Sequence, residues 1–413
     1  MTAPLSALTD SSGVENVVVF VSDAHRYDCL PVMVRSLGVT AKAIAPSTFT
    51  ASALPSLLTG QYPATHRVWM FDDRLVERPP LLDPEETDVG FDAEGVWIEL
   101  PSEQKPPLQI HHLERETKLS ALSPPFTHVV HDVGPHAPYG FENGVFESTR
   151  EFFAEHENRR PELVELYRQD CRNSAERFLE VYDQLVERDL LSDTLVVFTS
   201  DHGQCLGEPE NGGRFGHGHP MCPETVEIPV VFAGAGLPEG ETYEPLLSGT
   251  DLAPTALSAQ RGTVPEAVDG VDVWRTAPDP NRLHRSDVWQ HVDVGVGDLG
   301  RELSVYAATS AWNGTGGYVF HRKSRLERLA AVAYDNLLRG YGPAWLANAS
   351  FEKAWNLAAL SLAATRTYGD PDFEESEARR AVPSTFERET EGNTETTLNE
   401  EQEAQLRDLG YIG

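Results

Sequence analysis

The stretch Asn16–Ser22 (NVVVFVS) decides the fold class of this chain of 413 residues. Its unbroken apolar centre is typical of a strand buried on both faces of a parallel sheet, because a half-exposed strand alternates apolar with polar residues. Strands that alternate with helices predict an α/β fold, here a doubly wound, mostly parallel sheet flanked by helices. Similar strand-like runs follow at Ala41–Ala45, Phe126–His131, Leu195–Ser200 and Ile228–Ala233, and helical spacing occurs at 53–58, 148–189 and 251–260.

The pattern of strands and helices weakens beyond about Pro278, so we expect a second, smaller unit. A strand near Leu303–Ala308 and a helix over Ser324–Arg339 are expected there. The predicted parts are a catalytic domain, a smaller C-terminal subdomain that completes the fold, an acidic flexible connection and a C-terminal tail, at residues 14–277, 278–370, 371–400 and 401–413.

The composition is strongly acidic, with 65 Asp and Glu against 33 Lys and Arg and a formal net charge of −32. Binding to nucleic acid or to an anionic membrane requires a basic surface, so both classes of partner are excluded. Only five of the bases are lysines, and this composition resembles that of halophilic, haloarchaeal proteins. An acidic enzyme of a mesophile is the alternative, because net charge affects solubility rather than fold.

The apolar runs and the cysteines predict a cytoplasmic protein. The run Val17–Val21 is far shorter than the roughly 18 residues that a membrane-spanning helix needs. The N-terminus is polar and lacks the basic start of a secretory signal. The four cysteines have no CxxC spacing, which argues against structural zinc and a disulfide framework.

Asp and His residues cluster where the predicted strands begin or end. In open α/β sheets the ligand crevice lies at the carboxyl ends of the strands, and carboxylate with imidazole suits zinc, manganese or a similar divalent ion. One Asp at a strand end is more often a helix cap, but four clusters are hard to explain as caps. The clusters contain Asp23 and His25, then His131, Asp132 and His136, then Asp201 and His202, and finally His217 and His219.

Four motifs follow one another in order: NVVVFVSDAHRYD from Asn16, TASALPSLLTGQYPATH from Thr50, DTLVVFTSDHGQCLGE from Asp193 and HGHPMCPETVEIPVVFAG from His217. They resemble the alkaline phosphatase and sulfatase superfamily, in its sulfatase-like branch of hydrolases and transferases. The motifs match the family's opening strand with its metal-binding Asp, its nucleophile helix, its second metal motif and its spacing from a His to a later strand. The resemblance extends from Asn16 to about Val273 and includes the terminal LRDLGYIG.

The resemblance implies a nucleophile beside a metal ion. Thr50 falls at the family's nucleophile position, near the start of a helix whose N–H groups favour an anion. Asp23, Asp201 and His202 would hold the metal, which would also deprotonate the Thr50 hydroxyl for attack on a phosphoryl or sulfuryl centre. The alternative is that Thr50 only caps its helix.

The resemblance also implies a second metal site formed by Asp132 and His136, spaced D-x-x-x-H, together with His217. This site would hold the water that hydrolyses the covalent intermediate. In some relatives with one manganese, the equivalent histidines instead hydrogen-bond the transferred group. The expected cofactor is therefore one or two Zn²⁺ or Mn²⁺ ions, because histidine ligands disfavour calcium and magnesium.

Two positions depart from the formylglycine sulfatases, which need Cys or Ser and a later Arg where this chain has Thr50 and Leu54. No formylglycine can form, and this favours phosphate over sulfate esters. We therefore expect a metal-dependent hydrolase of phosphate mono- or diesters that passes through a covalent Thr50 intermediate, or a phosphotransferase. The alternatives are a sulfatase without formylglycine and a non-catalytic, anion-binding member of the family.

Further candidates lie beside the expected ligands. Arg26 would either contact the anion or pair with one of the many acids. His25, His131 and His219 would hold the ligands in place, and His219 would replace His217 as a ligand if the loop register differs. The expected partner is a small anionic ester. The sequence carries no signature for the organic part of this ester or for the oligomeric state.

Overall fold

The central sheet has eight strands within the described residues, in the order β10-β2-β8-β5-β1-β4-β3, with β9 paired to β2. The computed structural model describes residues 2–11, 13–93, 100–140, 148–156, 160–294, 301–330, 341–384 and 398–408. The strands of this sheet are β1 (Asn16–Ser22), β2 (Gly38–Ile44), β3 (Asp88–Asp92), β4 (Phe126–Asp132), β5 (Thr194–Thr199), β8 (Glu227–Gly234), β9 (Glu241–Thr242) and β10 (Leu247–Ser248).

The direction of β8 differs from the expected parallel arrangement. β1 is parallel to both β4 and β5, and β3 is parallel to β4, which confirms the mostly parallel sheet. β8, however, is antiparallel to both of its neighbours, β2 and β5. Because Thr199 at the end of β5 pairs with Val230, β8 begins at the edge of the sheet where β5 ends.

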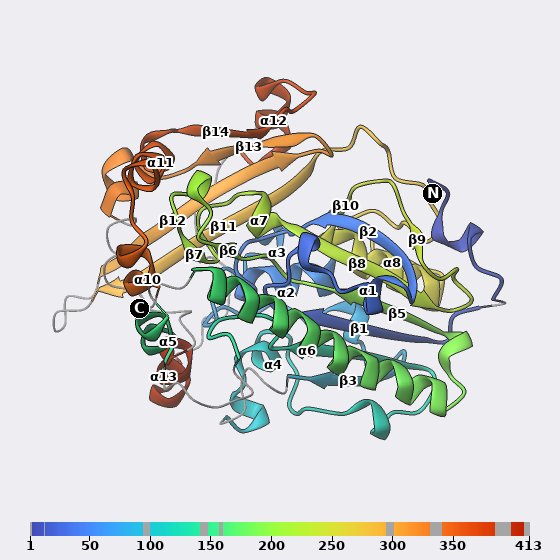
Figure 1. The fold of residues 1–413 in the computed structure, drawn as a ribbon. Coiled ribbons are helices and arrows are strands. Elements are labelled where there is room, and N and C mark those ends of the chain that lie inside the picture. Colours follow the sequence, from blue (N-terminus) through green and yellow to red (C-terminus); the bar gives the residue numbers. More distant parts are fainter. Residues whose placement is uncertain are drawn as a thin grey trace.

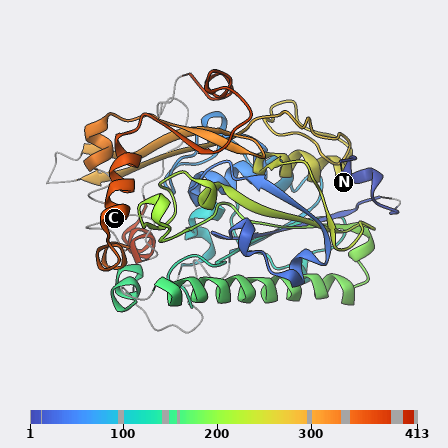
Figure 2. The same cartoon turned by 45° about the horizontal axis from the view of Figure 1, so that its top comes forward.

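Helices cover both faces of the central sheet. They are α1 (Val32–Arg35), α2 (Thr50–Thr59), α3 (Pro63–His66), α4 (Pro106–Ile110), α5 (Thr149–Glu155), α6 (Arg160–Glu187), α7 (Pro223–Val226), α8 (Leu252–Arg261), α10 (Gly342–Ala347), α11 (Phe351–Leu362), α12 (Glu375–Ala381) and α13 (Glu400–Asp408). In Figure 2 the long helix α6 runs along one side of the sheet. Within the described part of the chain, no helix has both the length and the apolarity needed to cross a membrane.

The sequence of β1 explains its central position. Val17, Val19 and Val21 belong to a core cluster that also contains Leu54 of α2. Val18 and Phe20 belong to a second cluster on the opposite face, with Phe178 of α6. Successive side chains of a strand point to opposite faces, so a strand with apolar residues at every position must be covered on both sides.

A separate antiparallel sheet packs over the central sheet (Figure 1). Its order is β11-β12-β13-β14, at His284–Val294, Arg301–Trp312, Gly316–His321 and Thr365–Gly369. The strand expected near Leu303–Ala308 is part of β12. Residues 325–330 are helical, while the rest of the expected helix to Arg339 lies outside the described residues. So do parts of the acidic connection and the tail, at 385–397 and 409–413. We retain the domain boundaries as a proposal.

Candidate active site

Three neighbouring strands deliver acidic and histidine side chains to one edge of the sheet. β1 lies between β4 and β5 and is parallel to both, so their carboxyl ends meet. Asp23 follows β1, His131 lies near the end of β4, and Asp201 comes two residues after β5. All three side chains are buried. This is the crevice position that an open α/β sheet offers to a ligand.

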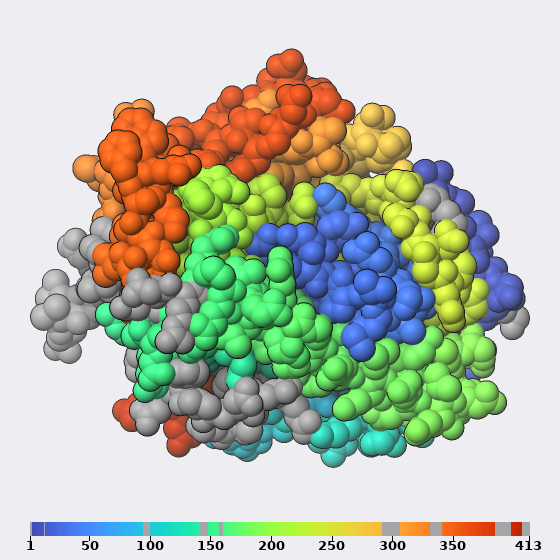
Figure 3. Space-filling view, viewed as in Figure 1, coloured from blue at the N-terminus to red at the C-terminus, as the bar shows by residue number. Residues whose placement is uncertain are grey.

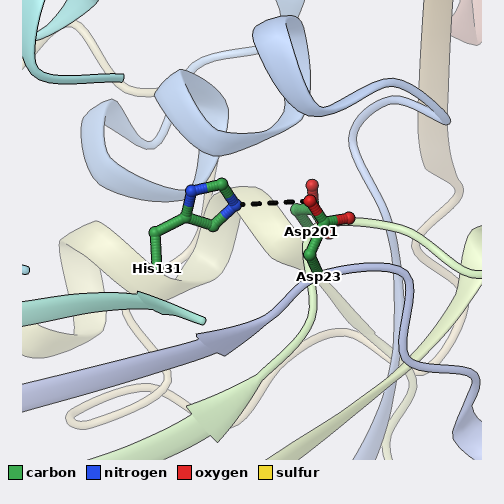
Figure 4. A group of neighbouring side chains, drawn as sticks. All are labelled: Asp23, His131 and Asp201. Atoms are coloured by element: carbon green, nitrogen blue, oxygen red, sulfur yellow. Dashed lines mark ion pairs between the residues drawn. The ribbon is translucent and has the colours of Figure 1, made fainter. Parts of the chain in front are cut away.

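Asp23, His131 and Asp201 form a compact group of candidate metal ligands (Figure 4). One ligand atom from each lies within 4.8 Å of the others, and Nε2 of His131 is 3.5 Å from Oδ2 of Asp23. Two carboxylates and one imidazole are a donor set that zinc or manganese accepts. The structure therefore brings together two of the ligands expected from the sequence and adds His131, for which a supporting role was expected.

The carboxylate of Asp201 fits a cation because its two oxygens have different surroundings. Oδ1 accepts hydrogen bonds from the backbone N–H groups of Ala24 (3.2 Å) and His202 (2.9 Å). Among the described residues, none donates a hydrogen bond to Oδ2. A buried carboxylate oxygen without a donor is costly, and a divalent cation between the carboxylates would remove that cost.

The electrostatics of the two carboxyls agree with this interpretation. Burial raises the pKa of Asp201 and the negative charge of Asp23 raises it further. Burial also opposes ionisation of Asp23, but the surrounding histidines, His136 first, hold its pKa well below the ordinary value. Two carboxylates in one buried site repel each other, so one of them resists ionisation until positive charge arrives.

Thr50 is the first residue of α2 and is only 1% exposed. Its Oγ1 lies 3.0 Å from Nε2 of His202. Nδ1 of His202 donates to the carbonyl oxygen of Gly203 at 2.9 Å, which leaves the lone pair of the neutral ring on Nε2. The Thr50 hydroxyl can therefore donate to His202. The same Nε2 is 3.7 Å from Asp23 Oδ1 and 3.5 Å from Asp201 Oδ2.

His136 and His217 face each other beside this group. Their Nε2 atoms are 2.9 Å apart. Nδ1 of His136 is bonded to the carbonyl oxygen of Ala137 at 2.7 Å, and Nδ1 of His217 to that of Thr48 at 3.3 Å. Two neutral rings held in this way direct lone pairs at each other, so a shared proton or a cation is needed between them. His217 also stacks on His202, with ring centroids 4.3 Å apart.

The His217 pairing depends on the direction of β8. Because β8 is antiparallel to β5, the segment that precedes β8 lies at the edge where β5 ends. A parallel β8 would have carried the His217 loop to the opposite edge. The loop is fixed there by Gly218, whose N–H donates to the carbonyl oxygen of Thr48 at 2.8 Å and whose own carbonyl accepts from Thr48 Oγ1 at 2.7 Å.

Asp132, which was expected to bind a second metal ion with His136 and His217, has a carboxylate that faces α6. Its carboxylate is bonded to Arg177 at 2.6 and 2.9 Å and to Ser174 at 2.7 Å, both in α6. His131 and Asp132 are adjacent in a strand, so their side chains point to opposite faces. When His131 points to the metal group, Asp132 must point to α6.

The other flanking candidates also have partners of their own. Arg26 pairs with Asp28 at 2.8 Å and with Glu208 at 2.6 Å, so of its two expected roles it has the pairing with acids. Nδ1 of His25 is 3.0 Å from Ser22 Oγ, and burial lowers the pKa of His25 to about 4. The ring of His219, two residues from His217, packs at a tilt of 51° against Tyr306 of β12, with ring centroids 4.8 Å apart.

Comparison with known proteins identifies the family of the chain. The family model described as Sulfatase matches residues 113–262. The chain is 44% identical over 414 residues to the low-salt glycan biosynthesis sulfotransferase Agl7 of Haloferax volcanii, and the match covers 100% of both chains. The chain therefore belongs to the sulfatase family of the alkaline phosphatase superfamily.

Solved structures agree on the fold. One is the phosphonate monoester hydrolase of Silicibacter pomeroyi, with a TM-score of 0.53 and 15% identity over 75% of this chain and 87% of that one. Another is the 2-O glycosaminoglycan sulfatase BT1596, with a TM-score of 0.53 and 13% identity over 75% of this chain and 83% of that one. At these identities the likeness shows the fold alone.

Proposed function

We propose that this chain is a sulfotransferase that moves a sulfuryl group from a sulfate ester, through Thr50, to a hydroxyl of a glycan. The observation that carries the proposal is the buried Thr50 hydroxyl, 3.0 Å from His202 and beside the group formed by Asp23, His131 and Asp201. The full-length similarity to a glycan biosynthesis sulfotransferase supports the reaction class and the acceptor.

The first half of the reaction forms a covalent intermediate. Oγ1 of Thr50 attacks the sulfur, the bond from sulfur to the donor's ester oxygen breaks, and that oxygen leaves with the donor as an oxyanion, which takes a proton from solvent. The Thr50 proton passes to Nε2 of His202, which is correctly oriented because Nδ1 donates to Gly203. The positive end of the α2 helix dipole favours the charge on the sulfuryl oxygens.

The second half returns the enzyme to its starting state. The acceptor hydroxyl attacks the sulfur and releases its proton to solvent, the bond from sulfur to Thr50 Oγ1 breaks, and Thr50 regains its proton from His202. Water competes with the acceptor in this step. Thr50 is 1% exposed, so bulk water has little access to the intermediate.

Asp23, His131 and Asp201 are the residues that would hold a divalent cation in this reaction. Such an ion supplies positive charge that stabilises the ionised Thr50 oxygen and the transferred group. His136 and His217 lie where they can hold either a second ion or, once protonated, the oxygens of that group.

A phosphate ester is the second candidate for the donor. It is favoured by Thr50 itself, which stands where formylglycine sulfatases have their modified residue and which forms a phosphothreonine that water or an alcohol can resolve. The two candidates differ in the donor that labels Thr50 and in whether an acceptor is needed for turnover.

The test uses p-nitrophenyl sulfate and p-nitrophenyl phosphate, with and without a glycan acceptor, in high-KCl buffer containing Mn²⁺ or Zn²⁺. We expect nitrophenol release from the sulfate that depends on the acceptor, and a sulfated Thr50 peptide when the acceptor is omitted. Thr50→Ala should abolish both. Thr59→Ala, at the other end of α2, is the matched control and should keep full activity, because Oγ1 of Thr59 bonds only to Pro55 and Gln61 among the described residues.

Each other outcome assigns a different function. Release from the phosphate alone would overturn the sulfotransferase in favour of the phosphoesterase. Release from the sulfate at the same rate without acceptor would make the chain a sulfatase. Activity of Thr50→Ala equal to wild type would remove the covalent mechanism.

A further inference from the structure

The residue that follows Asp23 adopts a backbone conformation that its side chain disfavours. Ala24 has φ of +61° and is fully buried. Glycine reaches this left-handed region at little cost, whereas the Cβ of any other residue comes too close to the following carbonyl oxygen. Such strain persists only where surrounding contacts hold it, and it is common at functional sites. We therefore looked for the groups that hold Ala24.

The backbone of Ala24 connects the two carboxylates of the candidate metal group. Asp23 directly precedes it, and its own N–H donates to Oδ1 of Asp201 at 3.2 Å. The next N–H along the chain, that of His25, donates at 2.8 Å to Oγ of Ser200, the residue directly before Asp201. The conformation of Ala24 therefore determines where Asp23 lies relative to Asp201.

One side chain of α6 holds the other side of this turn. The Tyr167 hydroxyl donates to the carbonyl oxygen of Ala24 at 2.7 Å and accepts from the backbone N–H of Arg26 at 3.0 Å. A hydroxyl has a single proton to donate, and here it is given to the left-handed residue. The two bonds span residues 24–26 and fix the direction in which the chain leaves Asp23.

Tyr167 is suited to this task because its ring is rigid and its hydroxyl stays protonated. The side chain is fully buried, and its ring lies edge-on to that of Tyr139 with centroids 5.6 Å apart. Burial raises the pKa of Tyr167 well above its usual range, so the hydroxyl keeps its proton at neutral pH. Figure 3 shows the green surface of α6 against the blue segment around α1, which follows this turn.

Packing alone does not account for a tyrosine at this position. The ring belongs to a core cluster with Phe152, Phe153 and Leu163. A phenylalanine would fill the same space in that cluster, and a buried tyrosine hydroxyl is costly unless it is hydrogen-bonded. The hydroxyl is therefore explained by its two bonds to the turn after Asp23.

We propose that Tyr167 is a positioning residue of the metal group: its hydroxyl holds Ala24 in the left-handed conformation, and Ala24 in turn places the Asp23 carboxylate opposite Asp201. Without the hydroxyl, Ala24 relaxes to a negative φ and Asp23 moves away from Asp201. Metal affinity then falls although every ligand is still present. This role does not depend on which group is transferred or on the acceptor.

The test measures the affinity of the metal-free chain for Mn²⁺ and Zn²⁺ by equilibrium dialysis in high-KCl buffer. Tyr167→Phe removes one oxygen atom and should lower the affinity about 10-fold, the lower end of the effect of outer residues at metal sites. Tyr182→Phe is the matched control. Tyr182 is also a buried residue of α6, but it belongs to another core cluster and lies about 22 Å further along the helix, at 1.5 Å per residue. Its variant should bind as wild type does.

A glycine at position 24 supplies a readout that a purely structural role would not change. Glycine adopts a φ near +61° with little strain, so it no longer needs the hydroxyl. Tyr167→Phe combined with Ala24→Gly should therefore regain most of the lost affinity, and Ala24→Gly alone should bind close to wild type. If Tyr167 acted through packing only, the second substitution would restore nothing.

The outcomes separate this proposal from the proposed function. Wild-type affinity in Tyr167→Phe would overturn it, as would a loss that Ala24→Gly does not restore, or a wild type that binds neither ion. If wild type transfers no group but the loss and its rescue are seen, the proposed function fails and the role of Tyr167 stands. In an active enzyme, saturating Mn²⁺ should return kcat of Tyr167→Phe close to wild type, because Thr50 and His202 are unchanged.

Discussion

His202 contacts both Thr50, the proposed nucleophile, and the two carboxylates. The distance from its Nε2 to Thr50 Oγ1, 3.0 Å, is shorter than the 3.5 and 3.7 Å to the carboxylate oxygens of Asp201 and Asp23. We therefore predict that His202→Gln keeps bound metal but lowers kcat by about 10²–10⁴-fold, the usual contribution of a general base. Metal content per chain, measured with the rate, checks this. A parallel loss of metal would make His202 a ligand, as the family resemblance implies.

A second prediction at the residue scale concerns the contribution of the Asp201 carboxylate to metal affinity. Asp201→Asn retains an oxygen that accepts from Ala24 and His202 but loses the negative charge. Mutation of a residue that only hydrogen-bonds to a metal ligand typically lowers metal affinity by roughly 10–100-fold. We expect Asp201→Asn to lower metal affinity by more than this, because it changes a ligand itself. Dialysis against Mn²⁺ followed by elemental analysis measures it. Asp28→Asn, at an exposed carboxylate paired with Arg26, should leave the affinity unchanged.

His131 and Asp132 show the limit of reading a site from sequence. Both residue types bind metals, and both stand near the end of a predicted strand. Alternation along β4 allows only one of them to face the metal group, and the sequence does not say which face that is. The choice is made by Arg177 and Ser174 of α6, which hold the Asp132 carboxylate and lie more than 40 residues away in the chain.

At the scale of elements, the turn that follows β4 contacts the backbone of Asp23, the residue directly after β1. Gly134 has φ of +55°, and a Cβ there would lie 2.2 Å from the backbone oxygen of Asp23 and 2.5 Å from its nitrogen. We predict that Gly134→Ala displaces Asp23 and lowers both metal affinity and turnover, although no ligand is changed.

Gly240→Ala is the control that separates backbone strain at a positive φ from displacement of Asp23. Gly240 has a similar φ of +70°, but a Cβ there would meet nothing within 4 Å. This variant should lose only about 1–2 kcal/mol of unfolding free energy, the cost of the left-handed conformation, and keep its metal affinity. Equal metal affinities in the two variants would contradict the prediction.

The elements themselves could be predicted in large part. The apolar runs of β1, β4, β5 and β8 and the helical spacing of α6 and α8 all correspond to elements of the structure. The direction of β8 could not be predicted, since an apolar run such as Ile228–Ala233 is the same whichever way the strand runs. That direction depends on its pairing with β2 and β5, which are distant in sequence.

At the scale of the whole molecule, the net charge of −32 predicts a dependence of stability on salt. Repulsion among surface carboxylates destabilises the compact state, and salt screens it, with a Debye length of about 10 Å at 0.1 M and 3 Å at 1 M. We expect the unfolding midpoint in urea to rise steadily from low to multimolar KCl. Sucrose at equal osmolality is the control, and an equal rise in sucrose would exclude charge screening as the cause.

The segment between β5 and β8 leaves the central sheet and re-enters it at the same edge. The part of it between His202 and His217 can therefore change in length without altering the order of the strands. It contains His217, which faces the reaction centre, and Arg214 and His219, which line a small cavity beside Tyr306 of the second sheet. Under the proposed function, relatives of this chain can thus diverge in the substrates they accept by changing the part of this segment between His202 and His217, while the residues of the reaction centre stay the same.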